Sequence, residues 1–122
     1  MRLRIISRVF QGAVLIVGYV GVSLSAPAAD GPKRIEVAAK RFAYTPSEIT
    51  LKKGEPVVLV LRSDDVAHGI KFKELGLDTE MHRGAIAELA FTPMQTGDFV
   101  GRCSRFCGAG HGSMTLTLHV TE

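Results

Sequence analysis

The sequence lacks the features of helical, repetitive and disordered proteins. It has 122 residues, no tryptophan and only two cysteines. No internal repeat, low-complexity segment or long amphipathic helix pattern occurs in it. A chain of this length forms one compact domain, and its 46% hydrophobic and 22% charged residues are ordinary for a globular protein. These observations exclude a multidomain protein, wholesale disorder and a polytopic membrane protein.

Acidic residues are absent from the first 29 residues, and the excess positive charge of the chain lies in this part. The formal net charge is +3, from 15 basic and 12 acidic residues. Arg2, Arg4 and Arg8 account for the whole excess, because 15 minus these three leaves 12 basic residues against 12 acids from Asp30 onward. The folded part is therefore close to neutral, and no nucleic-acid partner is predicted.

Residues 1–28 have the pattern of a secretory signal peptide. A basic start is followed by an apolar stretch at residues 9–24 and then by small residues, with Ala26 and Ala28 in an A-x-A arrangement. This order predicts cleavage after Ala28. Because the apolar stretch of about 16 residues falls just short of the ~17–25 that span a bilayer, a single uncleaved anchor is the alternative. Either way the remaining chain is exported, and membrane contact is expected only through this segment.

The rest of the chain has the pattern of short strands joined by turns. Residues 29–33 are expected to be a linker and residues 34–122 the folded domain. Residues 57–61 are a continuous apolar run suited to a strand buried on both faces, and residues 74–84 are expected to be irregular. Seven strands are expected, at residues 34–44, 48–52, 57–61, 68–73, 85–91, 97–102 and 114–121. Their spacing predicts an all-β Greek-key sandwich or small barrel.

One segment concentrates side chains that bind soft metals. Residues 103–114 carry two thiols, an imidazole and a thioether. These donors are Cys103, Cys107, His111 and Met114. Such a set favours copper over magnesium, calcium or manganese, and the three glycines between them allow the loop to bend. A further donor must come from elsewhere, and His68, at the start of an expected strand and followed by Gly69, is well placed.

Each candidate also has an ordinary structural explanation. The two cysteines could form a disulfide in an exported protein, and together with two histidines they would also suit zinc. Met114 could be the first inward residue of the last strand, and His68 could be a hydrogen-bonding or surface residue. His82 is expected in a loop and His119 on the exposed face of a strand, so neither is predicted to bind metal.

The order of the donors resembles the copper A domain of subunit II of haem-copper cytochrome c oxidases. The shared pattern is His…Cys-x3-Cys-x3-His-x2-Met, with residues 65–69 around the first histidine, and the similarity covers most of the exported part. The resemblance implies a cupredoxin fold and periplasmic electron transfer. It implies that Cys103 and Cys107 bridge two copper ions as thiolates. It further implies a set of terminal ligands: His68 and His111, one to each copper, with Met114 and the main-chain carbonyl of Arg105 as weak ligands.

Three departures from that family bear on the expected partners. Arg105 stands where the family usually has Glu, no tryptophan is available for electron entry, and paired transmembrane helices are missing. These departures favour a stand-alone carrier, soluble or singly anchored, over a conventional oxidase subunit. Redox proteins are the expected partners, either cytochrome c or an oxidase-type complex. An apolar shell of Phe72, Phe99 and Phe106 is expected to tune the site.

Several functions share this donor set. A mononuclear blue-copper site would use His68, Cys107, His111 and Met114 and leave Cys103 spare. A copper-delivery or storage module would have much the same sequence. A hydrolytic enzyme is not expected, because no Ser or Cys has a general base at motif spacing. A disulfide-bonded adhesion or structural sandwich is the alternative without a metal.

Overall fold

Strands dominate the part of the chain that the computed structural model describes, which is Gly18, Gly21 and residues 31–122. The expected signal segment and its cleavage point otherwise lie outside the described residues. The nine strands are β1 (Lys33–Lys40), β2 (Ala43–Thr45), β3 (Glu48–Lys52), β4 (Val57–Ser63), β5 (His68–Phe72), β6 (Leu77–Met81), β7 (Ala87–Phe91), β8 (Gly97–Arg102) and β9 (Thr115–Thr121). Two short 3-10 turns accompany them, η1 (Lys73–Leu75) and η2 (His111–Ser113). Within this described part, no helix has the length and apolar character needed to cross a bilayer.

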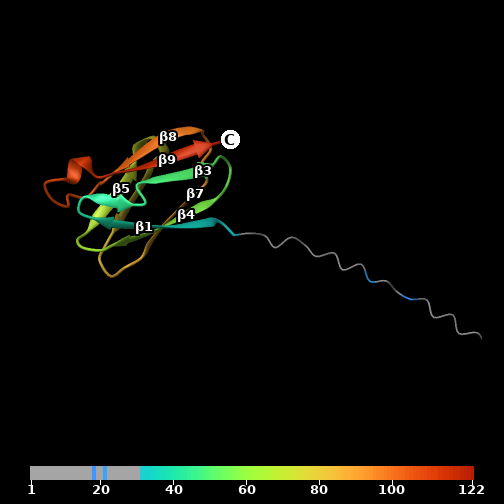
Figure 1. The fold of residues 1–122 in the computed structure, drawn as a ribbon, viewed down its shortest axis with the longest axis horizontal. Helices are drawn as coiled ribbons and strands as arrows, with labels where there is room; N and C mark the ends of the chain where they lie inside the picture. The colour runs from blue at the N-terminus through green and yellow to red at the C-terminus, as the bar shows by residue number, and fades with distance from the viewer. Residues whose placement is uncertain (1–17, 19–20, 22–30) are drawn as a thin grey trace, which may run out of the picture.

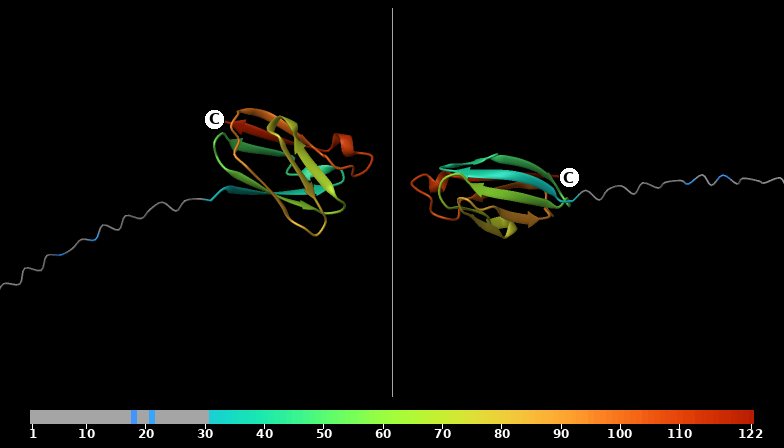
Figure 2. Two further views of the ribbon diagram at one scale, coloured as in Figure 1. Left: turned by 180° about the vertical axis from the view of Figure 1, so that it is seen from behind. Right: turned by 90° about the horizontal axis from the view of Figure 1, so that it is seen from below.

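The strands form two sheets that pack face to face (Figures 1 and 2). One sheet has the order β2-β1-β4-β7 and the other the order β3-β9-β8-β5-β6. Strand β1 runs parallel to β4, and β3 runs parallel to β9. The other pairs are antiparallel. The predicted all-β sandwich is therefore confirmed.

The core follows from the alternation of apolar and polar residues along the strands. In β9, Leu116 and Leu118 are fully buried, while Thr117 and His119 are half-buried on the other face. In β4, both Val58 and Leu59 are buried, which confirms the strand predicted to be covered on both faces. Each fully buried leucine contributes roughly 1.5–3 kcal/mol, so the facing strands hold the two sheets together.

Two strand predictions are corrected by the structure. Residues 74–84 are not irregular throughout, because Leu77–Met81 forms strand β6 and pairs with β5 along its whole length. Its two carboxylates point outward and mark an edge strand, which explains the weak apolar signal. The expected single strand 34–44 is divided at Arg41 and Phe42, where the chain turns back so that β2 pairs with β1.

Four connections meet at one end of the sandwich. They are residues 41–42, 64–67, 82–86 and 103–114, each beginning where a strand ends. The longest of them contains η2 and projects from the end opposite the C-terminus (Figure 1). The fold therefore brings the first residue of β5, His68, to the same end as the segment rich in sulfur donors.

Candidate metal centre

Three of the predicted donors form one buried cluster. A ring nitrogen of His68 and the sulfurs of Cys103 and Cys107 all lie within 4.8 Å of one another. His68 is fully buried, and the two cysteines are 6% and 5% exposed. His68 comes from the start of β5, whereas the cysteines follow β8. Side chains 35 and 39 positions apart in sequence are thus gathered at one point by the sheet.

The remaining predicted donors surround the two sulfurs. The His111 Nδ1 atom lies 3.8 Å from the Cys107 Sγ atom, and the Met114 Sδ atom lies 3.9 Å from the same sulfur. The carbonyl oxygen of Arg105 lies 3.1 Å from the Cys103 Sγ atom. All six predicted donor groups are therefore arranged around the pair of cysteines.

The donor loop is closed and covered by neighbouring residues. The backbone N–H of Cys103 donates to the carbonyl of Met114 at 3.2 Å. This hydrogen bond continues the pairing of β8 with β9 and joins the two ends of the loop. Gly108 has a φ of +138°, a value that favours glycine. The ring of Phe42 lies against the loop backbone, and a Cβ placed on Gly110 would come within 2.4 Å of it. Glycine at positions 108 and 110 therefore lets the Phe42 ring lie close to the loop backbone.

Gly69 permits the loop to approach β5 closely. A Cβ atom at this position would lie 2.2 Å from the Ser104 Oγ atom and 3.2 Å from the backbone nitrogen of Arg105. Any larger residue would push the segment after Cys103 away from the strand that carries His68. The glycine that follows His68 in sequence therefore sets the distance between the imidazole and the sulfurs.

His68 has one satisfied ring nitrogen and one free one. Its Nε2 atom lies 2.7 Å from the Asp65 Oδ1 atom. Its Nδ1 atom is buried and has no hydrogen-bond partner, and it is the only buried side-chain nitrogen or oxygen of that kind among the described residues. Leaving such an atom unpaired costs roughly 1–3 kcal/mol, so it calls for an explanation. A metal bound between the imidazole and the sulfurs supplies one, because ligating histidines usually engage a carboxylate through the other nitrogen.

Asp65 is held in its ionised form. Burial by itself would raise the pKa of Asp65. Three hydrogen bonds to its carboxylate outweigh the effect of burial, from the Arg41 backbone N–H, the His68 ring and the Val66 backbone N–H. These interactions hold the pKa of the carboxyl well below its usual range. An ionised Asp65 fixes the orientation of the His68 ring and places the proton on its Nε2 atom.

The Cys107 thiol is protonated in the absence of a metal. Burial, followed by the neighbouring Cys103 sulfur, raises the pKa of Cys107 to about 11. Burial, followed by the neighbouring Cys103 sulfur, also raises the pKa of Tyr44 far above its ordinary value, so its neutral hydroxyl donates to the Gly69 carbonyl. A metal bound to the sulfurs must displace a thiol proton, which makes binding stronger as the pH rises.

Sequence reasoning missed Arg41 and the roles of Asp65 and Tyr44. The Arg41 Nε atom donates to the Cys107 carbonyl at 2.8 Å, and nothing in its sequence neighbourhood indicated this contact. Asp65 did carry a signal, since its spacing of three residues from His68 suits a turn-anchored pair. Tyr44 carried none, because its hydroxyl reaches the site only through the pairing of β2 with β1.

The expected apolar shell is partly wrong. Phe72 and Phe99 are buried in the core, at 1% and 6% exposure, but Phe106 is 79% exposed. Its ring centroid lies 5.7 Å from that of His111. Phe106 follows Arg105 at the tip of the donor loop, where no strand pairs with it, so its side chain points into solvent instead of covering the sulfurs.

The geometry bears on the disulfide alternative for the cysteines and on the two histidines that were not expected to bind metal. The Cys103 and Cys107 sulfurs lie 3.7 Å apart, well beyond the roughly 2.05 Å of a disulfide. His82 lies in a loop and its Nε2 atom is 3.2 Å from Glu80. His119 lies on β9, with a 34% exposed side chain between Asp98 and Glu48. Neither histidine belongs to the cluster of His68, Cys103 and Cys107 found among the described residues.

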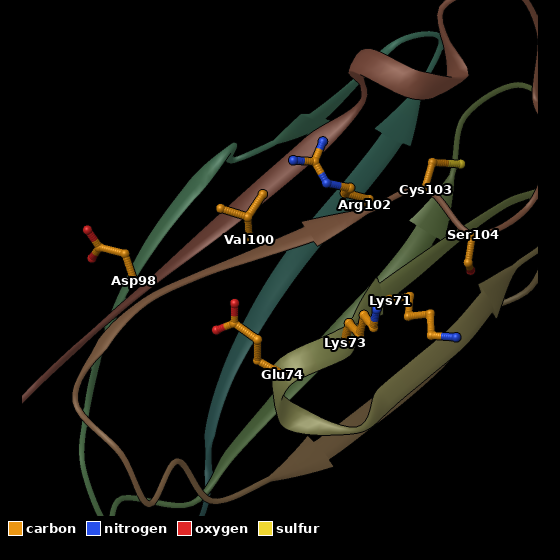
Figure 3. Close-up of a pocket in the computed structure, with 8 residues that line it drawn as sticks. All are labelled: Lys71, Lys73, Glu74, Asp98, Val100, Arg102, Cys103 and Ser104. Carbon is orange, nitrogen blue, oxygen red and sulfur yellow. The ribbon is translucent and has the colours of Figure 1, made fainter.

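A larger hollow lies beside the site but does not contain it. It measures about 600 Å³ and opens where β5 and β8, paired only at Lys71 and Arg102, diverge. Its lining residues are Lys71, Lys73, Glu74, Asp98, Val100, Arg102, Cys103 and Ser104. Figure 3 shows the Cys103 sulfur directed away from Glu74 and Asp98. The candidate metal centre is therefore the buried cluster, not this hollow.

Comparison with known proteins agrees with this geometry. The family described as "Cytochrome C oxidase subunit II, periplasmic domain" matches residues 28–121. A cytochrome c oxidase subunit 2 from Thermus thermophilus is 30% identical over 94 residues, which cover 75% of this chain and 70% of that protein.

Two solved structures share the fold. The periplasmic domain of subunit II of cytochrome oxidase from Bradyrhizobium japonicum has a TM-score of 0.69 at 21% identity, covering 79% of this chain and 87% of that one. Auracyanin A, a "blue" copper protein from Chloroflexus aurantiacus, has a TM-score of 0.61 at 18% identity, covering 75% and 100%. The predicted cupredoxin-like fold is thus confirmed. The match to residues 28–121 and the identity to the Thermus protein together show that this chain belongs to the cytochrome c oxidase subunit II family and contains its periplasmic domain.

Proposed function

We propose that the chain is a periplasmic electron-transfer protein whose buried cluster holds two copper ions in a copper A-type site. Cys103 and Cys107 bridge the ions as thiolates, and His68 and His111 bind one ion each. Met114 and the Arg105 carbonyl are weak ligands. Bound copper would supply one-electron redox chemistry at a site where His68, Cys103, Cys107 and Met114 are buried.

The unpaired Nδ1 atom of His68 is the observation that carries this proposal. This atom is buried, a ring nitrogen of His68 lies within 4.8 Å of two sulfurs, and the Nε2 atom is fixed by an ionised carboxylate. A histidine that only packed in the core would have both nitrogens satisfied. Imidazole combined with thiolate and thioether donors suits copper best among the common metals.

The protein contributes rigidity to the electron transfer. His68 stands on a paired strand, and the other donors lie on one loop closed by the Cys103–Met114 hydrogen bond. Ligands locked by packing and by surrounding hydrogen bonds rearrange little when the charge of the site changes. Two ions sharing two thiolates also spread that charge, so that each bond changes less.

Two observations favour two ions over a single blue-copper ion. The Cys103 sulfur lies in the same cluster as the His68 ring and the Cys107 sulfur, and the Arg105 carbonyl lies beside Cys103. A mononuclear site would leave both groups without a role. In a dinuclear site both groups have a role, Cys103 as a bridging thiolate and the Arg105 carbonyl as a weak ligand.

The assignment of Cys103 is tested by replacing it with serine in the copper-loaded chain. We expect the copper content to fall from two ions to one or fewer per chain, with loss of the spectrum of the pair. Ser104→Ala is the matched control, because it changes the neighbouring residue without removing a donor. If wild type binds one copper and Cys103→Ser keeps an intense blue absorption, the dinuclear assignment is wrong.

The setting of the domain is also part of the proposal. Residues 1–28 act as an export signal or a single anchor, residues 29–33 link it to the domain at residues 34–122, and the family points to an oxidase-type complex as the partner. N-terminal sequencing of the protein purified from the periplasm distinguishes the two forms. A mature N-terminus at Ala29 supports cleavage, and retention of Met1 in the membrane fraction supports the anchor.

A further inference from the structure

A second, smaller hollow lies on the surface of the donor loop. It has a volume of about 350 Å³, and the predicted ligand Cys107 is one of the residues that line it. Its lining residues are Arg41, Val66, Ala67, Arg105, Phe106, Cys107 and Gly108. Two arginines line it and no acidic side chain does. This distinguishes it from the larger hollow beside β8, which contains both Glu74 and Asp98.

The Arg41 guanidinium is available to an incoming anion. Its Nε atom donates to the Cys107 carbonyl at 2.8 Å, which orients the group and leaves its two terminal nitrogens free of any ion pair among the described residues. The backbone carbonyl is neutral, so the positive charge of Arg41 is not cancelled at this point. A guanidinium fixed in this way is pre-organised to bind a carboxylate through two N–H groups.

Arg105 is the second arginine that lines the hollow. Its Nη1 atom donates to Glu80 at 3.0 Å, and that carboxylate is shared with His82 at 3.2 Å. The Arg105 side chain is still 46% exposed. No acidic residue occurs between Asp98 and Glu122 in the sequence. The donor loop itself therefore carries no carboxylate, and the carboxylates that contact it, Asp78 and Glu80, both come from β6.

Phe106 adds an apolar contact to the same surface. Its side chain is 79% exposed, at the rim of the hollow and close to the His111 ring. Arginine and large aromatic side chains are enriched at the centres of protein interfaces. An apolar group beside two cations therefore suits contact with a protein better than contact with an inorganic ion.

We propose that this arginine-flanked hollow is the docking site for an acidic redox protein, which inserts a carboxylate side chain between Arg41 and Arg105. This inference rests on the proposed function, because it names the class of partner that exchanges electrons with the copper site. Docking here brings the partner to the backbone of Cys107 and to the ring next to His111. Since the folded part of the chain has equal numbers of acids and bases, the attraction is local to this surface.

Binding of fluorescein-labelled hexaglutamate to the full chain tests the site, with fluorescence anisotropy at low ionic strength as the readout. We expect Arg105→Glu to weaken binding about tenfold, because a charge-assisted contact is replaced by a repulsive one. Lys53→Glu is the matched control. Like Arg105→Glu, it reverses the charge of an exposed cation and breaks one ion pair, here between Lys53 and Glu122 at 3.8 Å. Lys53 lies next to the C-terminal strand, and the C-terminus is at the end of the sandwich opposite the donor loop (Figure 1). We expect its effect to stay below about twofold.

The outcomes separate the docking site from general charge attraction and from copper binding. Equal weakening by Arg105→Glu and Lys53→Glu, equal binding of labelled hexalysine, or no binding of hexaglutamate would overturn the proposal. Arg105→Gln covers the case in which the reversed charge disturbs folding, and it should also weaken binding. The measurement is made on metal-free and copper-loaded chain. Failure to load copper would contradict the proposed function and leave the docking result readable in the metal-free chain.

A second measurement connects the surface to electron transfer. In the reduced, copper-loaded chain, Arg105→Glu should slow oxidation by anionic hexacyanoferrate(III) by a factor similar to the loss of peptide binding. Oxidation by cationic tris(phenanthroline)cobalt(III) should slow less or become faster, so that the ratio of the two rates falls. If both oxidants slow equally, the substitution has altered the copper site itself, and the docking role of Arg105 is wrong.

Discussion

Two histidines of this domain have a carboxylate at nearly the same distance but stand in opposite surroundings. The His68 Nε2 atom lies 2.7 Å from Asp65, and the His119 Nδ1 atom lies 2.6 Å from Asp98. His68 is fully buried, and its second nitrogen has no partner. His119 is 34% exposed, and its second nitrogen lies 3.3 Å from Glu48.

The difference shows what distinguishes a metal ligand from a surface clamp. At His68, one carboxylate fixes the ring and leaves the other nitrogen unpaired in a residue clustered with two sulfurs, so a metal would complete its interactions. At His119, two carboxylates on β3 and β8 use both nitrogens, and the ring joins three neighbouring strands. A carboxylate next to a histidine is therefore no indication of metal binding unless the second nitrogen is free.

Replacing each histidine with alanine tests this contrast and should give its largest effect. Loss of a group that only supports a metal ligand typically weakens metal binding roughly 10–100-fold. Because His68→Ala removes a ligand itself, we expect it to weaken copper binding by more than that. His119→Ala should change copper affinity less than about twofold, because it lies outside the cluster. Competition titration with a copper chelator measures both. Comparable copper affinities for the two variants would contradict the distinction.

Asp65→Asn sharpens the same comparison from the other side of the ring. The amide no longer holds a charge next to the His68 Nε2–H, so the ring orientation and its basicity are less well fixed. We expect copper affinity to fall roughly 10–100-fold, while the domain stays folded. Asp98→Asn is the matched change beside His119 and should leave copper binding as it is. Equal losses in the two variants would show that the Asp65 effect is one of general charge.

Gly69→Ala tests whether close approach of the donor loop to β5 is needed. The new methyl group would meet the Ser104 Oγ atom at 2.2 Å, and we expect the free energy of unfolding to fall by roughly 1–3 kcal/mol. Adding Ser104→Ala removes that oxygen and leaves the Ser104 Cβ atom at 3.4 Å, so it should restore most of the loss. Urea unfolding of the four proteins of this cycle gives the coupling. Additive effects would mean that the two residues do not meet.

The smallest effect is expected from His119→Gln, and it depends on pH. Hydrogen bonds from His119 to Asp98 and Glu48 raise the pKa of the imidazole above its ordinary 6.5. A raised folded-state pKa contributes stability that is complete below the unfolded value and is lost as the pH rises through the folded value. The wild type should therefore exceed His119→Gln in unfolding free energy below pH 6.5, and the gap should close in alkaline solution. A gap that widened with pH would contradict this assignment.

The fold was largely predictable because strand alternation and turn residues are local signals. The β9 pattern of alternating leucine and threonine, and the apolar run of β4, each identified a strand by itself. Strand β6 was missed because an edge strand with Asp78 and Glu80 facing solvent carries little apolar signal. The turn at Arg41 was missed because no glycine or proline marks it.

The donor set was also predictable, but the groups around it were not. Spacing within one loop indicated Cys103, Cys107, His111 and Met114, because a short loop keeps its own residues together. The convergence of His68 with them depends on the pairing of β5 beside β8. Arg41 comes from the other sheet and reaches the site only in the folded chain. Long-range placement of this kind leaves no local pattern in a single sequence.

The electron paramagnetic resonance spectrum of the copper-loaded chain, recorded with metal analysis, tests the central claim most directly. One unpaired electron shared by two equivalent copper nuclei gives seven hyperfine lines, whereas one copper gives four. We predict a seven-line pattern at two coppers per chain. A four-line pattern at one copper per chain, or a chain that takes up no copper, would contradict the account.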